Sequence, residues 1–271
     1  MYASESNYHE ALERSRCEVS EGMGMATARL PVETEDPDEL PKNDFNVAEG
    51  VVLMCASALF TGLTPKECKE IASCARARTF ARDELLFVQG QPVRNLVLIQ
   101  TGSVKLSQLS PNGDEVILWM NGSGDTVCLP VDSSSGHTCS ARAMEKCRAL
   151  VWEYARLQKL LVEYPQIRKN ISQILHSRLY ELEERFREVA TEKVAKRVAL
   201  TLMRLLKNVG KMSDKGIEVS LSREELAQMT GTTLFTVSRL LSKWRDAGYV
   251  ESRREAIVVR DSESLLKATN K

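Results

Sequence analysis

Residues 221–259 read LSREELAQMTGTTLFTVSRLLSKWRDAGYVESRREAIVV. Ser222 is followed three residues later by Glu225, which is the spacing of a capping box at the start of a helix. The turn at 230–232 contains a glycine, and Thr233 is placed to cap a second helix. The buried side of that second helix is predicted from apolar residues at helical spacing, Val237, Leu240, Leu241 and Trp244. Two helices joined by a short glycine-containing turn indicate a helix-turn-helix, whose second helix enters the major groove of DNA.

A small β wing is predicted beyond Gly248, which ends the second helix. Residues 249–251 and 256–259 are strand-like and flank the polar stretch 252–255. Basic side chains of this region are expected to form a face suited to DNA phosphates, namely Arg239, Lys243, Arg245, Arg253 and Arg254. The alternative is an αα-hairpin that serves only in packing. It would require the capping box, turn, apolar spacing, wing and local charge to coincide by chance, so the pattern favours DNA binding.

Arg239 is the first candidate for reading a base, because an arginine fork that bonds guanine O6 and N7 is the commonest specific contact. Ser238, Thr236 and Phe235 complete the predicted base contacts. Hydroxyl and basic groups around them are assigned to phosphates, which fix the register of a protein on DNA without reading its sequence. This predicted phosphate set is Ser222, Thr232, Thr233, Lys243, Arg253 and Arg254.

A long helix is predicted after Pro165 from apolar residues that recur every three or four positions. The stripe consists of Ile171, Leu175, Leu179, Leu182, Phe186 and Val189, and from residue 175 its spacing approaches a coiled-coil seam. The opposite, polar face carries Arg178, Glu181, Glu184, Arg185 and Glu188. The stripe can pack onto the chain's own sheet or onto a second chain, and pairing of two chains is favoured. A second helix is predicted over 192–209, with Gly210 as its C-terminal stop.

Short β-rich runs fill residues 78–153. They comprise 85–88, 96–99, 103–106, 116–119 and 149–152, and glycine-containing turns lie between them. Regular short strands with glycine turns indicate a β-sandwich or roll. Ahead of them, Thr64-Pro65 followed by Glu67 predicts the start of a short helix.

The composition is that of a soluble globular protein of about two domains, with 43% hydrophobic and 27% charged residues in a chain of 271. No stretch approaches the roughly 20 apolar residues of a membrane-spanning helix. The absence of a secretory signal and the odd number of cysteines, seven, favour a reducing cytoplasm. The net charge of zero conceals an asymmetry, since residues 1–50 hold 4 Lys and Arg against 12 Asp and Glu, whereas residues 192–271 hold 16 against 10. Residues 1–44 are predicted to form an acidic, disordered extension.

The order of these features resembles the CRP/FNR (catabolite activator and fumarate-nitrate regulator) family of bacterial transcription regulators. The resemblance covers about Leu59 to Val259 and rests on Leu59-Phe60-x-Gly62-Leu63, the spaced glycines, the long helix and, most specifically, Thr236-Val237-Ser238-Arg239. It implies an α+β protein with a cyclic-nucleotide-binding-like β-roll at 45–164, a dimerisation helix at 165–190 and a winged helix-turn-helix at 191–271. It also implies a homodimer on a palindromic promoter site in double-stranded DNA, with RNA polymerase as a further partner.

The expected effector pocket departs from relatives that bind cyclic AMP. Those relatives show a Gly-Glu pair, an Arg-Ser or Arg-Thr pair that holds the cyclic phosphate, and a polar pair on the long helix. The corresponding positions here hold Cys128-Leu129, His137-Thr138 and Leu182-Glu183. Without the arginine, a cyclic phosphate loses its main charge-assisted contact, so cyclic AMP is not the expected effector.

Other effectors stay open at this point. Cys68 and Cys74 show a C-x5-C spacing, but an iron–sulfur cluster needs four converging thiolates, and buried small hydrophobes are the simpler role for the cysteines. Haem is a second option, with His137 as an axial ligand near the pocket. A regulator that needs no small ligand is a third. The cofactor is therefore left unassigned.

The recognition helix shows a further departure. Many relatives have a glutamate three residues before the serine or glycine of the motif, where this chain has Phe235. Phenylalanine offers only apolar contact, for instance to a thymine methyl, so an altered half-site is expected. No hydrolase, P-loop or zinc-protease motif is present, so no enzyme is expected. The alternative of another class is a cyclic-nucleotide-type scaffold protein without DNA activity, which leaves the basic module unexplained.

Overall fold

The computed structural model describes residues 47–127, 129 and 136–269. The acidic extension predicted for residues 1–44 and the predicted pocket residue Cys128 lie outside this part of the chain. The described chain begins with α2 (Val47–Ala56), the 3-10 helix η1 (Ala58–Phe60) and α3 (Pro65–Ser73). The predicted start of α3 is confirmed, because the Thr64 backbone N–H donates to Glu67 at 2.7 Å and the Glu67 N–H donates to the Thr64 hydroxyl.

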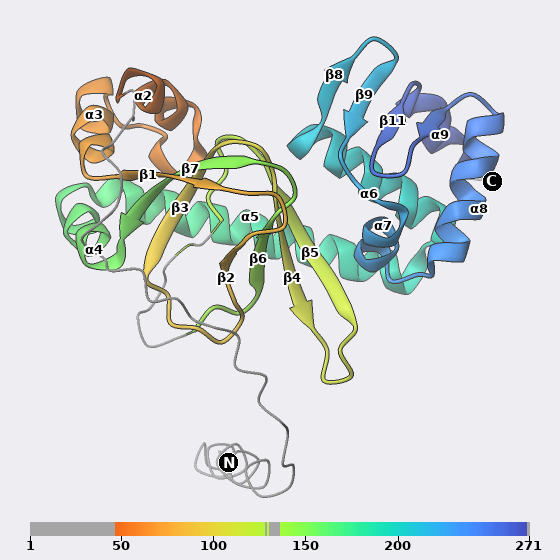
Figure 1. The fold of residues 1–271 in the computed structure, drawn as a ribbon, viewed down its shortest axis with the longest axis horizontal. Helices are drawn as coiled ribbons and strands as arrows, with labels where there is room; N and C mark the ends of the chain where they lie inside the picture. Colours follow the sequence, from red (N-terminus) through yellow and green to blue (C-terminus); the bar gives the residue numbers. More distant parts are fainter. Residues whose placement is uncertain (1–46, 128, 130–135, 270–271) are drawn as a thin grey trace, which may run out of the picture. The chain divides into compact units, whose positions relative to one another are not determined.

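Seven strands form the predicted β-roll (Figure 1). They are β1 (Arg76–Phe80), β2 (Leu85–Phe87), β3 (Asn95–Thr101), β4 (Val104–Leu109), β5 (Glu115–Asn121), β6 (Ser140–Ala143) and β7 (Cys147–Glu153). One antiparallel sheet has the order β1-β7-β3 and the other β2-β6-β4-β5. Buried residues from both sheets, including Phe80, Ile99 and Leu106, form one apolar cluster between them. The five predicted runs correspond to β2, β3, β4, β5 and β7, whereas β1 and β6 were not predicted.

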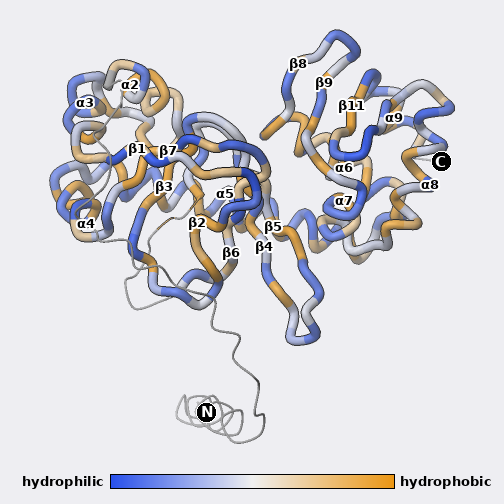
Figure 2. The backbone as a smooth tube through the Cα atoms, in the orientation of Figure 1, coloured by the Kyte–Doolittle hydropathy of each residue, from blue (hydrophilic) through white to orange (hydrophobic). Residues whose placement is uncertain are grey.

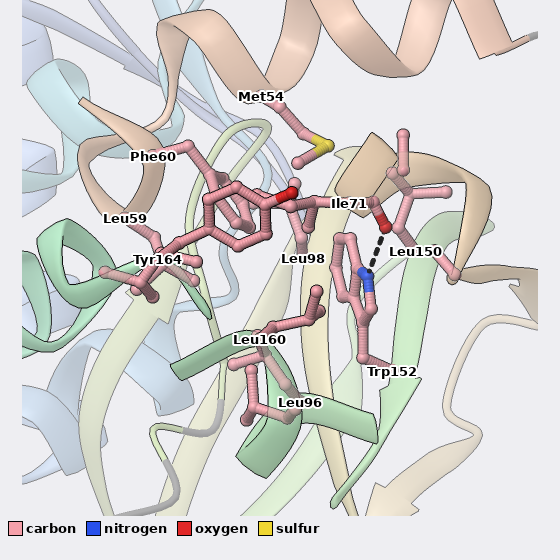
Figure 3. Close-up of a cluster of buried hydrophobic side chains, with 14 of the residues drawn as sticks. Met54, Leu59, Phe60, Ile71, Leu96, Leu98, Leu150, Trp152, Leu160 and Tyr164 are labelled. Carbon is pink, nitrogen blue, oxygen red and sulfur yellow. Dashed lines mark hydrogen bonds between the residues drawn. The ribbon is translucent and has the colours of Figure 1, made fainter. Parts of the chain in front are cut away.

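A second apolar cluster joins the first helices, the β-roll and the start of the long helix. Trp152 of β7 lies at its centre and is fully buried, with its ring centroid 5.8 Å from that of Phe60 (Figure 3). Its indole N–H donates to the backbone oxygen of Ile71 at 2.9 Å, which satisfies the one polar atom of the ring. Asn170 is also buried and donates to the backbone oxygens of Leu59 and Thr61. These bonds fix α3 and the start of the long helix against the roll.

Three helices follow the roll, of which the second and third were predicted and the first was not. They are α4 (Tyr154–Glu163), the 27-residue helix α5 (Pro165–Thr191) and α6 (Val194–Val209). The C-terminal module contains β8 (Lys211–Ser213), β9 (Gly216–Val219), α7 (Arg223–Thr230), α8 (Leu234–Asp246), β10 (Val250–Ser252), β11 (Ile257–Val259) and α9 (Ser262–Thr269). Hydropathy along the backbone is high in α2 and low at the tip of the β4–β5 hairpin (Figure 2). None of the helices in the described ranges could cross a membrane.

Two local expectations need correction. The wing is not a two-stranded hairpin alone, because β10 and β11 belong to an antiparallel sheet with the order β10-β11-β9-β8. Gly210 follows the last residue of α6 as predicted, but its φ is −67°, so it does not end the helix in a left-handed conformation. A Cβ at Gly210 would lie 2.2 Å from the Leu206 backbone oxygen, so close packing requires glycine there.

The turn between β3 and β4 contains a glycine that is closely packed against the start of β7. Gly102 has a φ of +87°, and a Cβ there would lie 2.8 Å from the Lys146 backbone oxygen and 2.9 Å from the Cys147 Cα. Gly113 also has a φ of +87°, but no atom lies within 4 Å of its Cβ position. We expect Gly113→Ala to lower the free energy of unfolding by about 1–2 kcal/mol through backbone strain alone. Gly102→Ala should cost a further 1–3 kcal/mol, roughly, through overpacking, as urea denaturation will measure. Equal losses in the two variants would contradict this reading of the turn.

Candidate nucleic-acid interface and sensor residues

The predicted helix-turn-helix is confirmed in its local hydrogen bonds. The Glu225 N–H donates to the Ser222 hydroxyl at 3.1 Å, and the Ser222 N–H donates to the Glu225 carboxylate at 2.9 Å. Gly231 ends α7 in the left-handed conformation with a φ of 58°. The Thr236 N–H then donates to the Thr233 hydroxyl, which caps α8. Both helix starts and the turn are therefore set by side chains that the sequence identifies.

Helix α8 has one buried face and one exposed face. Val237, Leu241 and Trp244 are buried in the core of the module. On the exposed side, Phe235 has 76% of its surface accessible, which is unusual for a large apolar side chain and marks it as a contact candidate. Arg239 is also exposed and forms no ion pair with any residue that the structure describes. The helix therefore presents an arginine and a phenylalanine outward from a rigid support.

The other predicted contacts differ in how free their side chains are. Thr233 and Thr236 lie together, with their hydroxyl oxygens 3.0 Å apart, at the first turn of α8. Ser238 and Thr232 are half-buried. The Ser222 hydroxyl is already engaged in capping α7, and the Glu225 carboxylate that completes the capping box is 3.6 Å from Lys105 of β4. A phosphate contact by Ser222 stays a prediction with the least geometric support.

The predicted cationic face is only partly available. Arg253 pairs with Glu218 at 3.5 Å and with Glu251 at 3.7 Å, and Arg245 pairs with Asp246. Lys243 and Arg254 are exposed and make no ion pair within residues 136–269 or with the described roll. Free cations attract DNA phosphates more strongly than cations already paired with carboxylates. Lys243 and Arg254 are therefore the stronger phosphate candidates.

The long helix α5 turns its apolar side outward, whereas most helices pack their apolar side against the core. Its apolar stripe is exposed at Leu175, Leu179, Leu182, Phe186 and Val189, with accessible fractions of 37%, 55%, 40%, 76% and 58%. Ile171 is the exception and corrects the prediction, because it is buried in the chain's own core and is not available to a partner. The alternative, in which the stripe packs onto the chain's own sheet, is wrong for these five exposed residues.

The polar face of α5 packs inward. Arg178 donates to the Thr126 backbone oxygen at 2.7 Å, and Glu188, 6% exposed, forms a bidentate pair with Arg204 of α6 at 2.7 and 2.8 Å. Arg185 donates to the backbone oxygens of Leu118 in β5 and Met229 in α7. Burial lowers the pKa of the Arg185 guanidinium below its usual value. These contacts join segments that are distant in the sequence, so local spacing does not reveal them.

A buried lysine also links the roll to α7. Lys105 of β4 is 8% exposed and lies 3.3 Å from Glu115 of β5 and 3.6 Å from Glu225. Ile117 and Met120 of β5 belong to the same apolar cluster as Leu226 and Trp244 of the helix-turn-helix. The capping residue Glu225 thus has two roles, at the start of α7 and as a partner of the roll. Sequence reasoning missed Lys105 because its strand pattern resembles that of an ordinary surface lysine.

The described residues of the predicted effector pocket lie in different surroundings. His137 is buried, with its ring stacked on Phe87 at 3.7 Å between centroids, and burial lowers the pKa of its imidazole. Thr138 is exposed, and its backbone oxygen accepts a bond from Gln108. Leu129 is half-buried beside the Trp152 cluster, whereas Leu182 and Glu183 are exposed on α5. Of these described residues, His137 lines the cavity formed with Phe87, and the others do not.

Two buried cysteines, Cys68 and Cys147, are poor candidates for thiolate ligands. Burial raises the pKa of Cys68 to about 12 and that of Cys147 to about 11, which keeps both thiols protonated at neutral pH. No group of three or more His, Cys, Asp or Glu side chains is placed to hold a metal ion within the chain as described.

Comparison with known proteins matches both halves of the chain. A family model of the cyclic nucleotide-binding domain matches residues 77–164, and a model of the Crp-like helix-turn-helix domain matches residues 196–268. The chain is 24% identical over 218 residues to the CRP-like cAMP-activated global transcriptional regulator of Mycobacterium tuberculosis, covering 79% of this chain and 97% of the relative. It is 23% identical to Electron transport regulator A of Shewanella oneidensis, covering 70% of this chain and 77% of the relative.

Solved structures share the fold. The c-di-GMP responsive global regulator CLP of Xanthomonas campestris matches with a TM-score of 0.63 and 24% identity, over 72% of this chain and 99% of that one. FixK2 of Bradyrhizobium japonicum also matches with a TM-score of 0.63, at 22% identity, over 71% of this chain and 96% of that one. The roll, the long helix, the confirmed helix-turn-helix and these matches together lead to one conclusion: the chain is a member of the CRP/FNR family of transcription regulators with a helix-turn-helix DNA-binding domain.

Proposed function

We propose that this regulator binds a palindromic promoter site in double-stranded DNA as a homodimer, with α8 in the major groove. The observation that carries the proposal is the exposed face of α8, where Arg239 and Phe235 project from a helix whose other side is buried. Arg239 is assigned to a guanine, and Phe235 to an apolar contact such as a thymine methyl. Thr236 and Ser238 flank these side chains, while Thr232, Thr233, Lys243, Arg253 and Arg254 hold phosphates.

The homodimer is supported by the exposed stripe of α5. Five apolar side chains in a row exceed the scattered exposed residues of an ordinary monomer surface and mark an interaction site. Their spacing suits a two-helix seam. In a dimer, the two copies of α8 would bind half-sites one helical turn apart, about 34–36 Å between centres.

In this proposal the regulator binds DNA in the cytoplasm. At the promoter it recruits or blocks RNA polymerase. Cyclic AMP is not its effector in this proposal, because the position expected to hold the phosphate-binding arginine is His137, whose pKa is lowered by burial. A haem or iron–sulfur cofactor gains no support from the raised pKa values of Cys68 and Cys147.

The variant Arg239→Ala tests base recognition by α8. We expect it to reduce discrimination between the selected site and scrambled DNA by about 1–3 kcal/mol, because the arginine's bonds to a base are lost while the phosphate contacts remain. Lys243→Ala is the matched control on the same helix. It should weaken binding to all sequences alike and reduce the log–log salt slope by about one unit. Fluorescence anisotropy over a salt series measures both quantities. Discrimination that survives in Arg239→Ala would exclude this residue as the base reader.

A further inference from the structure

A cavity of about 320 Å³ lies at one end of the β-roll, against strands β1, β2, β3 and β7. Three of its lining side chains are basic, Arg78, Arg94 and His137, and two are amides, Gln91 and Asn95. No aspartate or glutamate is among the described residues that line it. The remaining wall is apolar and includes Phe80 and Phe87. Ligand sites of proteins have this character, an apolar wall with a few convergent polar groups.

The basic groups are held in different ways. The Arg78 guanidinium lies 4.5 Å from the centre of the Phe80 ring and 3.3 Å from Glu84, so its position at the cavity is fixed from two sides. Arg94 is exposed, and its guanidinium forms no ion pair with the described part of the chain. A planar guanidinium matches the two oxygens of a carboxylate or phosphate. The pair therefore offers an anion one ordered contact, Arg78, whose charge is shared with Glu84, and one free and adaptable contact, Arg94.

The aromatic wall of the cavity suits the apolar, ring-containing part of a ligand. Phe87 and His137 are stacked with an interplanar angle of 8°, which gives the cavity a flat, rigid side. Burial lowers the pKa of His137, which favours the uncharged imidazole in this wall. A flat ring packs well against such a surface. The volume lies at the lower end of ligand pockets, which limits the ligand to a compact molecule.

We propose that this cavity binds a small organic anion, with its carboxylate or phosphate group on Arg78 and Arg94 and its ring against the Phe87–His137 stack. The site shares His137 with the nucleotide position expected from the sequence, but the other predicted pocket residues that the structure describes, Leu129, Thr138, Leu182 and Glu183, do not line it. The inference does not require DNA binding, because every residue in it belongs to the roll.

Titration calorimetry of the full chain with benzoate and with phenyl phosphate tests the proposal and separates the two kinds of anion. We expect saturable binding of at least one of them, weakened at least tenfold in Arg78→Ala and in Arg94→Ala, and no binding of the uncharged benzamide. His137→Phe keeps the stacked wall and should retain most of the affinity. Arg148→Ala is the matched control, because Arg148 is exposed on β7 and does not line the cavity.

Three results would overturn the proposal. The first is no saturable binding of either anion at millimolar concentration, and the second is equal binding of benzamide. The third is an equal loss of affinity in Arg148→Ala and in the two lining variants. Circular dichroism identifies any variant that is unfolded. If an alanine variant is unfolded, the double variant Arg78→Lys/Arg94→Lys is measured in its place, because it keeps the charge but removes the planar guanidinium groups. DNA binding measured on the same samples distinguishes failure of this site from failure of the proposed regulator function.

Discussion

A double variant Leu179→Glu/Phe186→Glu is expected to be monomeric and to lose about 10²–10⁴-fold in affinity for a palindromic DNA site. Both side chains are exposed, at 55% and 76%, so the change leaves the core of each chain intact. Four carboxylates would then face one another in a two-chain seam, which like-charge repulsion and lost apolar burial both oppose. Without the seam, the two copies of α8 bind DNA independently, and the gain in affinity from binding two linked half-sites is lost.

Sedimentation equilibrium and DNA anisotropy measure the two parts of this prediction. The matched control is Val162→Glu/Met212→Glu, which alters two apolar residues that are 71% and 83% exposed and lie off α5. The control should stay dimeric and bind DNA normally. Binding of a single half-site should be similar for both double variants, because α8 is unchanged. A Leu179→Glu/Phe186→Glu protein that still sediments as a dimer would remove α5 from the proposed interface.

Local signals in the sequence predicted the parts of the fold that depend on neighbouring residues. The capping boxes at Thr64 and Ser222 and the turn at Gly231 are confirmed because their partners lie within a few positions. The orientation of α5 could not be read in this way. Its amphipathic pattern identifies two faces, but which face is buried depends on distant groups, such as Arg204 for Glu188 and the backbone of β5 for Arg185.

The same limit applies to the sensor residues. The motif positions 137–138 and 182–183 follow from alignment with relatives, yet His137 is buried beside Phe87, whereas Leu182 is exposed on α5. Arg78 and Arg94 carry no sequence signal, because arginines on short strands and turns are ordinary surface residues. Their convergence on one cavity is a consequence of how β1, β2 and β3 meet, which depends on the pairing of whole sheets rather than on spacing.

Arg204→Met is expected to lower the free energy of unfolding by about 3–5 kcal/mol, because it leaves the Glu188 carboxylate buried without its bidentate partner. Only 8% of the Glu188 side chain is exposed, and both of its oxygens accept bonds from Arg204. The pair joins the end of α5 to α6, so it connects the proposed dimer helix to the first helix of the DNA-binding module. Urea denaturation followed by circular dichroism measures the loss.

A double-mutant cycle with Glu188→Met separates the charge from the packing. The double variant Glu188→Met/Arg204→Met has no buried charge left, so its stability should return to within about 1 kcal/mol of the unaltered protein or exceed it. The pair Arg187 and Glu184 on the same helix is the control, because its side chains are 53% and 39% exposed, and Arg187→Met should cost less than about 1 kcal/mol. If Arg204→Met costs no more than Arg187→Met, then Glu188 reaches solvent and the pair does not hold α6 against α5. If the double variant is as unstable as Arg204→Met, then the contribution of Arg204 lies in the packing of its aliphatic stem rather than in its charge.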